Sequence, residues 1–188
     1  MKTYLYRGVP VLGFAAYSGT GKTTLLKRLL PRLIELGRRP AIVKHAHHDF
    51  DIDYPGKDSY ELRKAGANQV LVGSNQRWAM IVETPLLAEA NLTNFLARLE
   101  LTDTDIILVE GFRDERYPKI EIQRTSLERP LFYPHDDCVI AIATDSTADH
   151  NSTVPVIELA DVECLADFIV RYCNEAVVSA RTSQQSPH

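Results

Sequence analysis

Apolar residues recur along the chain in two patterns, short continuous runs and longer runs with helical spacing. The continuous runs cover residues 9–15, 40–45, 105–111 and 139–145 and are typical of strands buried in a parallel sheet. Leucines recur at helical spacing from Leu25 until Gly37, where a helix would end, and Pro31 lies inside this run. Residues 162–177 predict a closing helix. Strands and helices therefore alternate, as in an α/β fold.

Shorter segments complete this prediction. Residues 57–67 predict a short helix, and residues 86–99 a longer one with possible interruptions at Asn91 and Thr93. Residues 69–73, 78–83 and 154–159 predict strands, and residues 119–123 alternate as in an edge strand. No repeat or linker divides the chain, so residues 1–178 are expected to form one nucleotide-binding domain, with a disordered tail over residues 179–188.

The segment between the first strand and the first helix fits a phosphate-binding P-loop. Gly19, Gly21, Lys22 and Thr23 match the pattern G-x-x-x-x-G-K-[ST], with Ala16 in place of its first glycine. In such a loop, backbone N–H groups converge on phosphates at a helix N-terminus. Lys22 would reach the β- and γ-phosphates, and the Thr23 hydroxyl would bind Mg²⁺. The alternative is a glycine turn that only joins strand to helix, but the apolar run before it and the amphipathic run after it favour the P-loop.

This motif narrows the fold class to a P-loop NTPase-type doubly wound α/β fold, with a mostly parallel sheet and helices on both faces. Ligands of such folds lie beyond the carboxyl ends of the strands. Glu110 ends one apolar strand, where P-loop proteins place an acid that holds Mg²⁺ or its waters. It would alternatively position an attacking water. The other interpretation of Glu110 is a capping or surface carboxylate.

A second group of ionisable residues follows the strand at residues 40–45. It contains Lys44, His45, His47, His48, Asp49, Asp51 and Asp53. Adjacent histidines do not easily aim at one ion and no cysteine flanks them, which argues against structural zinc. Asp49 or Asp51 would supply a second Mg²⁺ contact, Lys44 would contact phosphate, or the loop would bind a second anionic ligand. A solvated polar loop is the remaining alternative. Arg77, Arg113 and Arg116 are further anion-binding candidates.

Composition and charge exclude several classes of protein. The chain has 188 residues, 45% of them hydrophobic, and a net charge of −4, so extended nucleic-acid binding is not expected. Its 3 cysteines show no C-x-x-C spacing and are expected to be reduced thiols. No signal-type segment or membrane-length apolar stretch is present. The expected location is the cytoplasm.

The ordered series of motifs resembles the MobB family of molybdopterin-guanine dinucleotide biosynthesis adapter proteins. The series consists of the P-loop, the Lys44–Asp49 segment, the P-G-K-D-S-Y-E-L-R-K-A-G-A segment at 55–67 and Val109–Phe112. The resemblance implies a homodimer that binds GTP, is at most a weak GTPase, and assists a guanylyltransferase in attaching GMP to molybdopterin. Molybdopterin itself is a second possible ligand.

The resemblance also implies residue roles. The phosphates would be held by Ser18, Gly19, Thr20, Gly21, Lys22, Thr23 and Thr24. Thr23 and Glu110 would contact Mg²⁺, and Lys22 and Glu110 would support any hydrolysis. The N-K-x-D guanine signature is absent. Asp145 would accept hydrogen bonds from guanine N1 and N2, or it would simply cap a loop.

Two other functions fit the P-loop. One is a small-molecule kinase with Asp49 as the base for the acceptor hydroxyl, although no compact arginine-rich lid is apparent apart from Arg113 to Arg116. The other is a binding module in which GTP orders residues 47–53 and so creates a partner surface.

Overall fold

The computed structural model describes residues 1–46, 50–84, 90–147 and 152–184. The contacts within the chain divide it into two compact units. Unit 1 comprises Met1–His45 and Asn91–His188, and unit 2 comprises Ala46–Ala90. The sequence did not predict this division, because residues 46–90 show no composition shift at either end. One nucleotide-binding domain over residues 1–178 stays a prediction.

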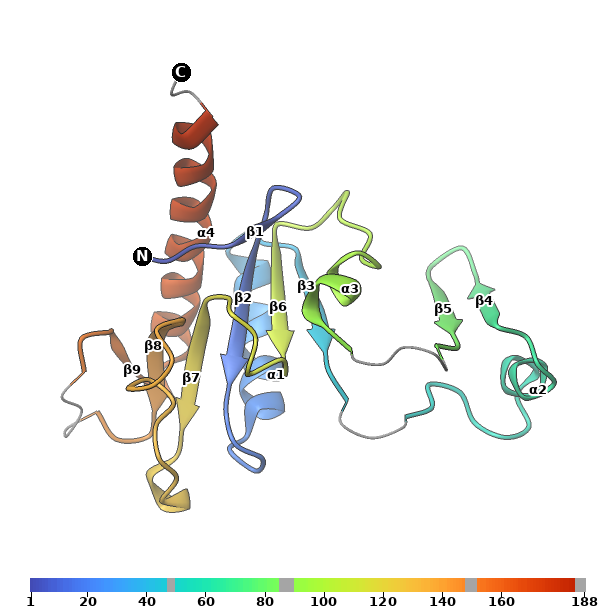
Figure 1. Ribbon diagram of the computed structural model, residues 1–188, viewed down its shortest axis with the longest axis horizontal. Helices are drawn as coiled ribbons and strands as arrows, with labels where there is room; N and C mark the ends of the chain where they lie inside the picture. The colour runs from blue at the N-terminus through green and yellow to red at the C-terminus, as the bar shows by residue number, and fades with distance from the viewer. Residues whose placement is uncertain (47–49, 85–89, 148–151, 185–188) are drawn as a thin grey trace. The chain divides into compact units, whose positions relative to one another are not determined.

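Unit 1 is built on a 7-stranded sheet with the order β3-β6-β2-β7-β8-β9, and β1 pairs with β2 outside this path. Every pairing is parallel except that of β1 with β2 (Figure 1). The predicted mostly parallel sheet is therefore confirmed. The strands are β1 (Leu5–Tyr6), β2 (Val9–Ala15), β3 (Pro40–Lys44), β6 (Ile106–Glu110), β7 (Lys119–Gln123), β8 (Val139–Thr144) and β9 (Val156–Glu158).

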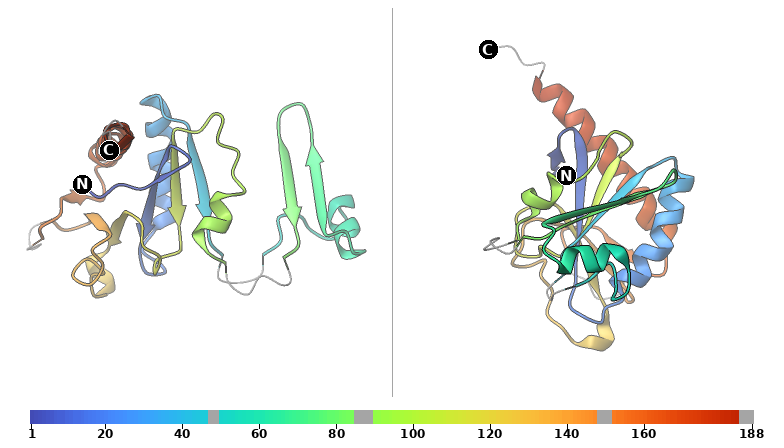
Figure 2. Two further views of the ribbon diagram at one scale, coloured as in Figure 1. Left: turned by 45° about the horizontal axis from the view of Figure 1, so that its top comes forward. Right: turned by 90° about the vertical axis from the view of Figure 1, so that its right-hand side faces the viewer.

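Helices lie on both faces of this sheet. Figure 2 shows α1 (Lys22–Glu35) and α4 (Val162–Gln184) on one face and the short α3 (Leu92–Leu96) on the other. Leu12 and Phe14 of β2 point toward the first pair of helices and share one apolar core with Leu29 and Ile169. Burial of this apolar core supplies the main stabilisation of the unit, since each fully buried apolar side chain contributes about 1.5 to 3 kcal/mol.

The prediction of an edge strand over residues 119–123 is wrong. β7 lies between β2 and β8, and its two charged residues are buried with partners. Lys119 Nζ donates to the Asp136 carboxylate at 2.9 Å, and Glu121 accepts from the backbone N–H groups of Phe132 and Tyr133 at 2.8 Å each. Buried charges persist where they are paired and hydrogen-bonded, so the polar positions did not indicate solvent exposure here.

Three other boundaries differ from the predictions. β3 was predicted to be a buried strand, but it lies at one edge of the sheet. Its Ile42 is therefore 39% exposed. The helix expected over residues 86–99 is limited to α3, because the Asn91 side chain caps its start by accepting from Asn94 N–H. Residues 85–89 lie outside the described part. α4 continues to Gln184, so residues 179–184 are helical and not disordered; a helix already nucleated on the core propagates at little cost.

Unit 2 contains α2 (Asp58–Lys64) and an antiparallel hairpin of β4 (Gln69–Gly73) and β5 (Trp78–Val82), all three near their predicted positions. Arg63 lies at its centre and pairs with Asp51, Asp53 and Glu83. Within the described residues, no helix has the length and apolar character needed to cross a membrane.

Candidate nucleotide-binding site

The loop that joins β2 to α1 has the backbone geometry that the P-loop motif requires. Gly19 and Gly21 have φ angles of 83° and 88°, in the left-handed region that residues with side chains rarely adopt. Gly21 is the N-cap of α1, so the free N–H groups of the first helical turn begin directly after it. Ala16 is not among the residues with positive φ. Alanine therefore replaces the first glycine of the motif without backbone strain.

Lys22 lies across this loop. Its Nζ donates to the carbonyl oxygens of Ala16 and Tyr17, each at 3.2 Å. Burial lowers the pKa of Lys22, the nearby Glu110 carboxylate opposes that effect, and the positive charges of Lys44 and Arg113 add to it. Four charged side chains therefore share one electrostatic environment at this edge of the sheet.

Glu110 comes close to the P-loop because of strand register. It pairs with Phe14 of β2 on one side and with Lys44 of β3 on the other. Its side chain is 14% exposed, and Lys44 Nζ lies 3.5 Å from its Oε2. Glu110 therefore lies at the end of the strand next to β2, and its role at a metal stays a prediction.

The turn after Glu110 depends on close packing against His45. Gly111 has a φ of 104°, and a Cβ there would lie 2.6 Å from the His45 Cβ. The His45 ring stacks on Phe112 with 4.5 Å between ring centroids, and Phe95 packs edge-on against Phe112 at 5.2 Å. His45 is thus a packing residue at the end of β3, a role that its place in the ionisable segment did not indicate.

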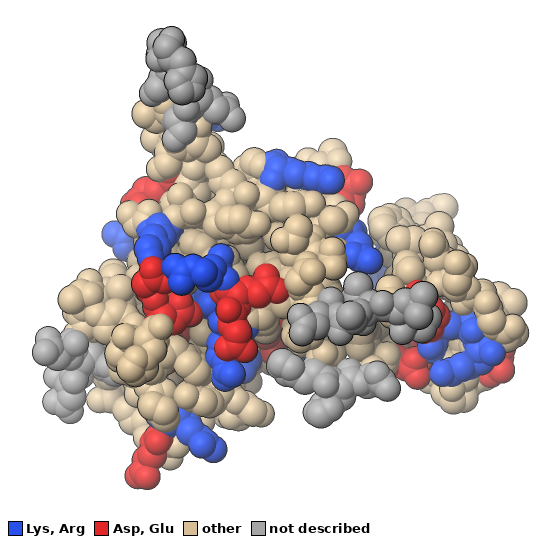
Figure 3. All heavy atoms as spheres, viewed as in Figure 1, with Lys and Arg blue, Asp and Glu red and all other residues tan. Residues whose placement is uncertain are grey.

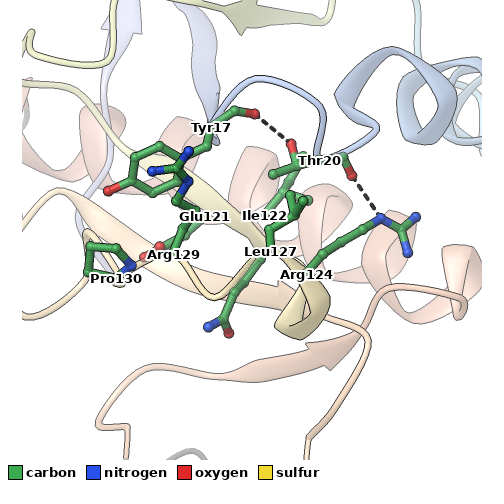
Figure 4. A pocket seen from close by; sticks show the side chains of 9 residues that line it. Tyr17, Thr20, Glu121, Ile122, Arg124, Leu127, Arg129 and Pro130 are labelled. Atoms are coloured by element: carbon green, nitrogen blue, oxygen red, sulfur yellow. Dashed lines mark hydrogen bonds between the residues drawn. The ribbon is translucent and has the colours of Figure 1, made fainter.

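The other predicted phosphate contacts fall into two groups. Ser18, Thr23 and Thr24 are exposed at the loop and the first turn of α1. Thr20 is buried, and its hydroxyl donates to the Tyr17 carbonyl oxygen at 3.0 Å (Figure 4). The Thr20 backbone N–H donates to the same carbonyl oxygen at 3.5 Å, so both groups of Thr20 stabilise the loop.

Arg124 was not anticipated by sequence reasoning. It follows β7 directly, and its Nε donates to the Thr20 carbonyl oxygen at 3.0 Å, across 104 residues of sequence (Figure 4). No local motif signals such a contact. Its other partner is Asp145, whose Oδ2 lies 3.6 Å from the Arg124 Nη1.

Asp145 lies at the end of β8 and caps the start of the short 3-10 helix η1 (Thr125–Leu127). Its Oδ1 accepts from the Thr125 backbone N–H at 2.9 Å and from the Thr125 hydroxyl at 3.1 Å. These bonds and the Arg124 charge lower the pKa of Asp145. Asp145 therefore joins the end of β8 to the start of η1, and a contact with guanine stays a prediction.

The remaining candidates for metal binding come from the segment that follows β3. Asp49, His47 and His48 lie outside the described residues. Asp51 pairs with Arg63 inside unit 2. Within the described residues, one cluster of three potential metal ligands was found, consisting of Asp136, Asp137 and Cys138. Its carboxylates are paired with the cations Lys119, Lys2 and Arg116, which accounts for their position without a metal.

The residues at the P-loop edge fit a Mg²⁺–nucleotide complex. The Thr23 hydroxyl and the Glu110 carboxylate are oxygen donors, the class of ligand that Mg²⁺ prefers. Lys22 and the helix N-terminus provide donors and positive potential for phosphates. On the face of unit 1 shown in Figure 3, basic and acidic side chains are mixed, in keeping with the absence of an extended basic surface there.

Comparison with known proteins identifies relatives over most of the chain. A family model described as molybdopterin guanine dinucleotide synthesis protein B (MobB) matches residues 11–145. A protein of Escherichia coli (strain K12) named molybdopterin-guanine dinucleotide biosynthesis adapter protein is 50% identical over 165 residues, which cover 87% of this chain and 93% of that protein. A Haemophilus influenzae protein of the same name is 38% identical over 167 residues, covering 88% and 90%.

Solved structures share the fold. The crystal structure of molybdopterin-guanine biosynthesis protein B (mobB) has a TM-score of 0.65 and 26% identity, and the comparison covers 86% of this chain and 98% of that one. The crystal structure of Bacillus subtilis MobB has a TM-score of 0.67 at 24% identity, covering 87% and 97%. These neighbours support the predicted P-loop NTPase-type fold.

Proposed function

The chain belongs to the MobB family, the adapter proteins of molybdopterin guanine dinucleotide biosynthesis, and from this premise we propose that it binds GTP with Mg²⁺ and assists a partner guanylyltransferase. The observation that carries the proposal is the loop after β2, in which Gly19 and Gly21 have positive φ angles and Lys22 opens α1, while Glu110 ends the neighbouring strand β6. The partner would use GTP to attach GMP to molybdopterin. The complex would act in the cytoplasm.

Nucleotide binding would begin with an exchange of partners at Lys22. Its Nζ now donates to two carbonyl oxygens of the loop, and β- and γ-phosphate oxygens would take their place. The Lys22 ammonium would gain direct attraction to the negative charge of the phosphates, which neutral carbonyl oxygens do not offer, so this exchange favours the bound state. The backbone N–H groups of residues 18–24 would complete the contacts, and Asp145 is the candidate for recognising guanine.

Thr23 and Glu110 would hold the Mg²⁺, which would neutralise phosphate charge. Glu110 already has Lys44 as an ion-pair partner at 3.5 Å. A carboxylate shared in this way with a lysine is poorly placed to activate a water molecule, since a general base must be within hydrogen-bond reach of that water and free to accept its proton. We therefore expect GTP hydrolysis to be slow and the protein to act mainly as a nucleotide-dependent adapter.

A homodimer is the second part of the proposal, and the hairpin of unit 2 supports it. Leu71 and Met80 are register partners, and Trp78 lies on the same side of the hairpin. All three are large, apolar and between 48% and 67% exposed. An isolated two-stranded hairpin is marginally stable in water, and exposed apolar faces of this kind mark interaction sites. A second copy of the chain is the proposed partner for this face.

The dimer is tested by sedimentation velocity on three proteins. Wild type is expected to sediment as a dimer, and Leu71→Glu combined with Met80→Glu as a monomer, because a buried interface does not tolerate unpaired charges. Gln76→Glu, an exposed position in the hairpin turn, should leave the dimer unchanged. A monomeric wild type would contradict this part of the proposal.

Calorimetric titration with GTP and with ATP, each with Mg²⁺, tests the nucleotide site. GTP should bind more tightly than ATP, and Lys22→Ala should weaken binding by about 1.5 to 3 kcal/mol, or roughly ten- to 150-fold. Lys27→Ala is the matched control, because Lys27 is an exposed lysine on the same helix. Unchanged affinity in Lys22→Ala would refute the P-loop assignment, and a preference for ATP would refute the choice of GTP.

The adapter role is tested by adding the protein to a guanylyltransferase assay, in which product formation should increase.

A further inference from the structure

Two aromatic rings and two arginines form a column beside the P-loop. Tyr17, a P-loop residue, stacks on Phe132 with 4.5 Å between ring centroids and 25° between ring planes. The Arg113 guanidinium carbon lies 5.1 Å from the Phe132 centroid, and that of Arg129 lies 5.7 Å from the Tyr17 centroid. Because the rings cover each other's inner faces, each guanidinium lies on an outer face. Figure 4 shows Arg129 against the Tyr17 ring.

A cavity of about 480 Å³ opens on the Arg113 side of this column. Its volume falls within the range of small-molecule sites, roughly 300 to 1,000 Å³. Apolar groups from Pro130, Leu131 and Phe132 form part of its wall, with Tyr17, Arg113 and His135 among the polar residues that line it. All of these residues belong to unit 1. The cavity thus combines an apolar wall with a few polar groups, as ligand sites commonly do.

The charged groups around the cavity differ in how many hydrogen bonds and ion pairs they make within the protein. Lys119 Nζ donates to Asp136 at 2.9 Å and to the Arg113 carbonyl oxygen at 2.7 Å. Arg116 donates to Asp137 at 2.9 Å. Glu115 accepts from the Leu92 backbone N–H at 2.7 Å.

Arg113 is much less engaged than its neighbours. Its side chain is 46% exposed, and its ion-pair partner is Asp114, at 3.4 Å, whose own side chain is 90% exposed. A single long contact to a solvated carboxylate contributes little. Most of the guanidinium N–H donors therefore remain available to an incoming anion, while the stack on Phe132 holds the guanidinium plane in place.

The cavity adjoins the nucleotide site. Tyr17 contributes its carbonyl oxygen to Lys22 and its ring to the cavity wall. The positive charge of Arg113 contributes to the lowered pKa of Lys22. A ligand in the cavity would therefore lie close to the phosphates of a nucleotide held by the P-loop.

We propose that this cavity binds a second ligand, a planar heterocycle that carries an anionic group. The ring would stack on the open face of the Arg113 guanidinium, as nucleobases stack on arginine planes, and the anionic group would accept its N–H donors. The proposal deepens the proposed function and rests on it for the identity of the ligand, since a phosphorylated pterin has both features. The site itself is defined by Tyr17, Arg113 and Phe132 alone.

Fluorescence anisotropy with pterin-6-carboxylate tests the site, because this probe is planar, anionic and fluorescent. The probe should bind wild type both without nucleotide and with saturating Mg²⁺ and GDP. Arg113→Ala should weaken probe binding at least tenfold, and Arg113→Lys should weaken it less, because it keeps the charge and loses the stacking plane. Arg171→Ala is the control, since Arg171 is an exposed arginine of α4 that does not line this cavity, and it should change the affinity less than twofold. Far-UV circular dichroism verifies the fold of each variant.

The outcomes separate the alternatives. Displacement of the probe by GDP would place it on the P-loop and overturn the second site, as would unchanged affinity in Arg113→Ala. Equal binding of uncharged pterin would overturn the role of the anionic group. Inorganic phosphate should compete with the probe. Because phosphate is anionic and has no ring, this competition measures recognition of the anionic group alone. If calorimetry shows no GTP binding while the probe still depends on Arg113, the proposed function fails and the cavity assignment stands.

Discussion

Lys44 and Glu110 are register partners at the carboxyl ends of β3 and β6, and their side chains meet with 3.5 Å between Nζ and Oε2. On its other side Glu110 is in register with Phe14, two residues before the P-loop begins at Ala16. One carboxylate is therefore shared between a strand-end ion pair and the surroundings of Lys22. This sharing explains why the pKa of Lys22 reflects burial, Glu110 and Lys44 together.

Replacement of Glu110 should reduce the contribution of Mg²⁺ to nucleotide binding. In Glu110→Gln the neutral amide is a poor Mg²⁺ ligand, so the ratio of GTP dissociation constants without and with Mg²⁺ should fall by roughly tenfold or more. Without Mg²⁺ the variant should bind GTP at least as tightly as wild type, because a negative charge near the phosphates has been removed. Calorimetric titration under both conditions gives the ratio. Glu128→Gln, at an exposed position, is the control, and an unchanged ratio in Glu110→Gln would argue against the metal role.

The elements predicted best are those whose signal is local. β2, β6 and β8 appear as uninterrupted apolar runs, and α1 as leucines at helical spacing, because both faces of a central strand and one face of a helix must be buried. β7 was misjudged because Lys119 and Glu121 look like surface residues in sequence. Their partners Asp136 and Phe132 lie 17 and 11 residues further along the chain, where no pattern links them.

In the candidate site, too, the local features were predicted from the sequence and the long-range contacts were not. The P-loop and the strand-end position of Glu110 follow from short motifs together with the rule that parallel strands end at one edge. The Arg124 contact to Thr20 and the stack of Tyr17 on Phe132 join segments that are more than 100 residues apart. Such contacts depend on the strand order, which places β7 next to β2. The sequence alone does not specify that order.

Gly13 of β2 is expected to tolerate no side chain. A Cβ there would lie 2.5 Å from Tyr117 Cε2 and 2.8 Å from its hydroxyl oxygen. The Tyr117 ring cannot move freely, because its hydroxyl donates to the Gly111 carbonyl oxygen at 2.8 Å. Gly13→Ala should therefore lower the free energy of unfolding by about 1 to 3 kcal/mol, the usual cost of overpacking, as measured by urea denaturation.

The control for this change is Gly73→Ala, because a Cβ at Gly73 meets its nearest neighbour at an ordinary 3.6 Å. It should change stability by less than about 0.5 kcal/mol. In a Tyr117→Leu background, Gly13→Ala should lower the free energy of unfolding far less, since the ring atoms that clash with the new Cβ are gone. Equal costs in both backgrounds would show that the ring is not the source of the strain.

The three cysteines should differ sharply in reactivity. Cys164 is exposed, whereas Cys138 and Cys173 are buried. Burial raises the pKa of Cys173 to about 11, so at neutral pH this thiol is almost entirely protonated and hardly nucleophilic. Burial also raises the pKa of Cys138, and the neighbouring Asp136 adds to this. Iodoacetamide at pH 8 should label Cys164 alone, as read by peptide mass spectrometry, and all three after denaturation. Rapid native labelling of Cys173 would contradict its buried position.

Arg63 organises the polar centre of unit 2. Its Nη2 donates to Asp51 at 2.6 Å and to Asp53 at 2.7 Å, and its Nη1 donates to Glu83 at 3.0 Å. These hydrogen bonds raise the pKa of Arg63, with Asp53 as the largest contributor. Two of the partners precede α2, and Glu83 follows β5. One side chain therefore joins the start of the unit to its second strand.

Loss of Arg63 should consequently loosen unit 2 while the sheet of unit 1 stays intact. Arg63→Ala leaves three carboxylates close together without their shared cation, and like charges at short range repel. Hydrogen exchange with mass spectrometry should show faster exchange in β4 and β5, with exchange in β2 and β6 as in wild type. Lys64→Ala is the matched control, because Lys64 is the exposed neighbouring residue of the same helix and packs over Tyr60 rather than pairing with an acid. Equal exchange in β4 and β5 of wild type and Arg63→Ala would mean that the apolar contacts of the hairpin hold this unit without the ion pairs.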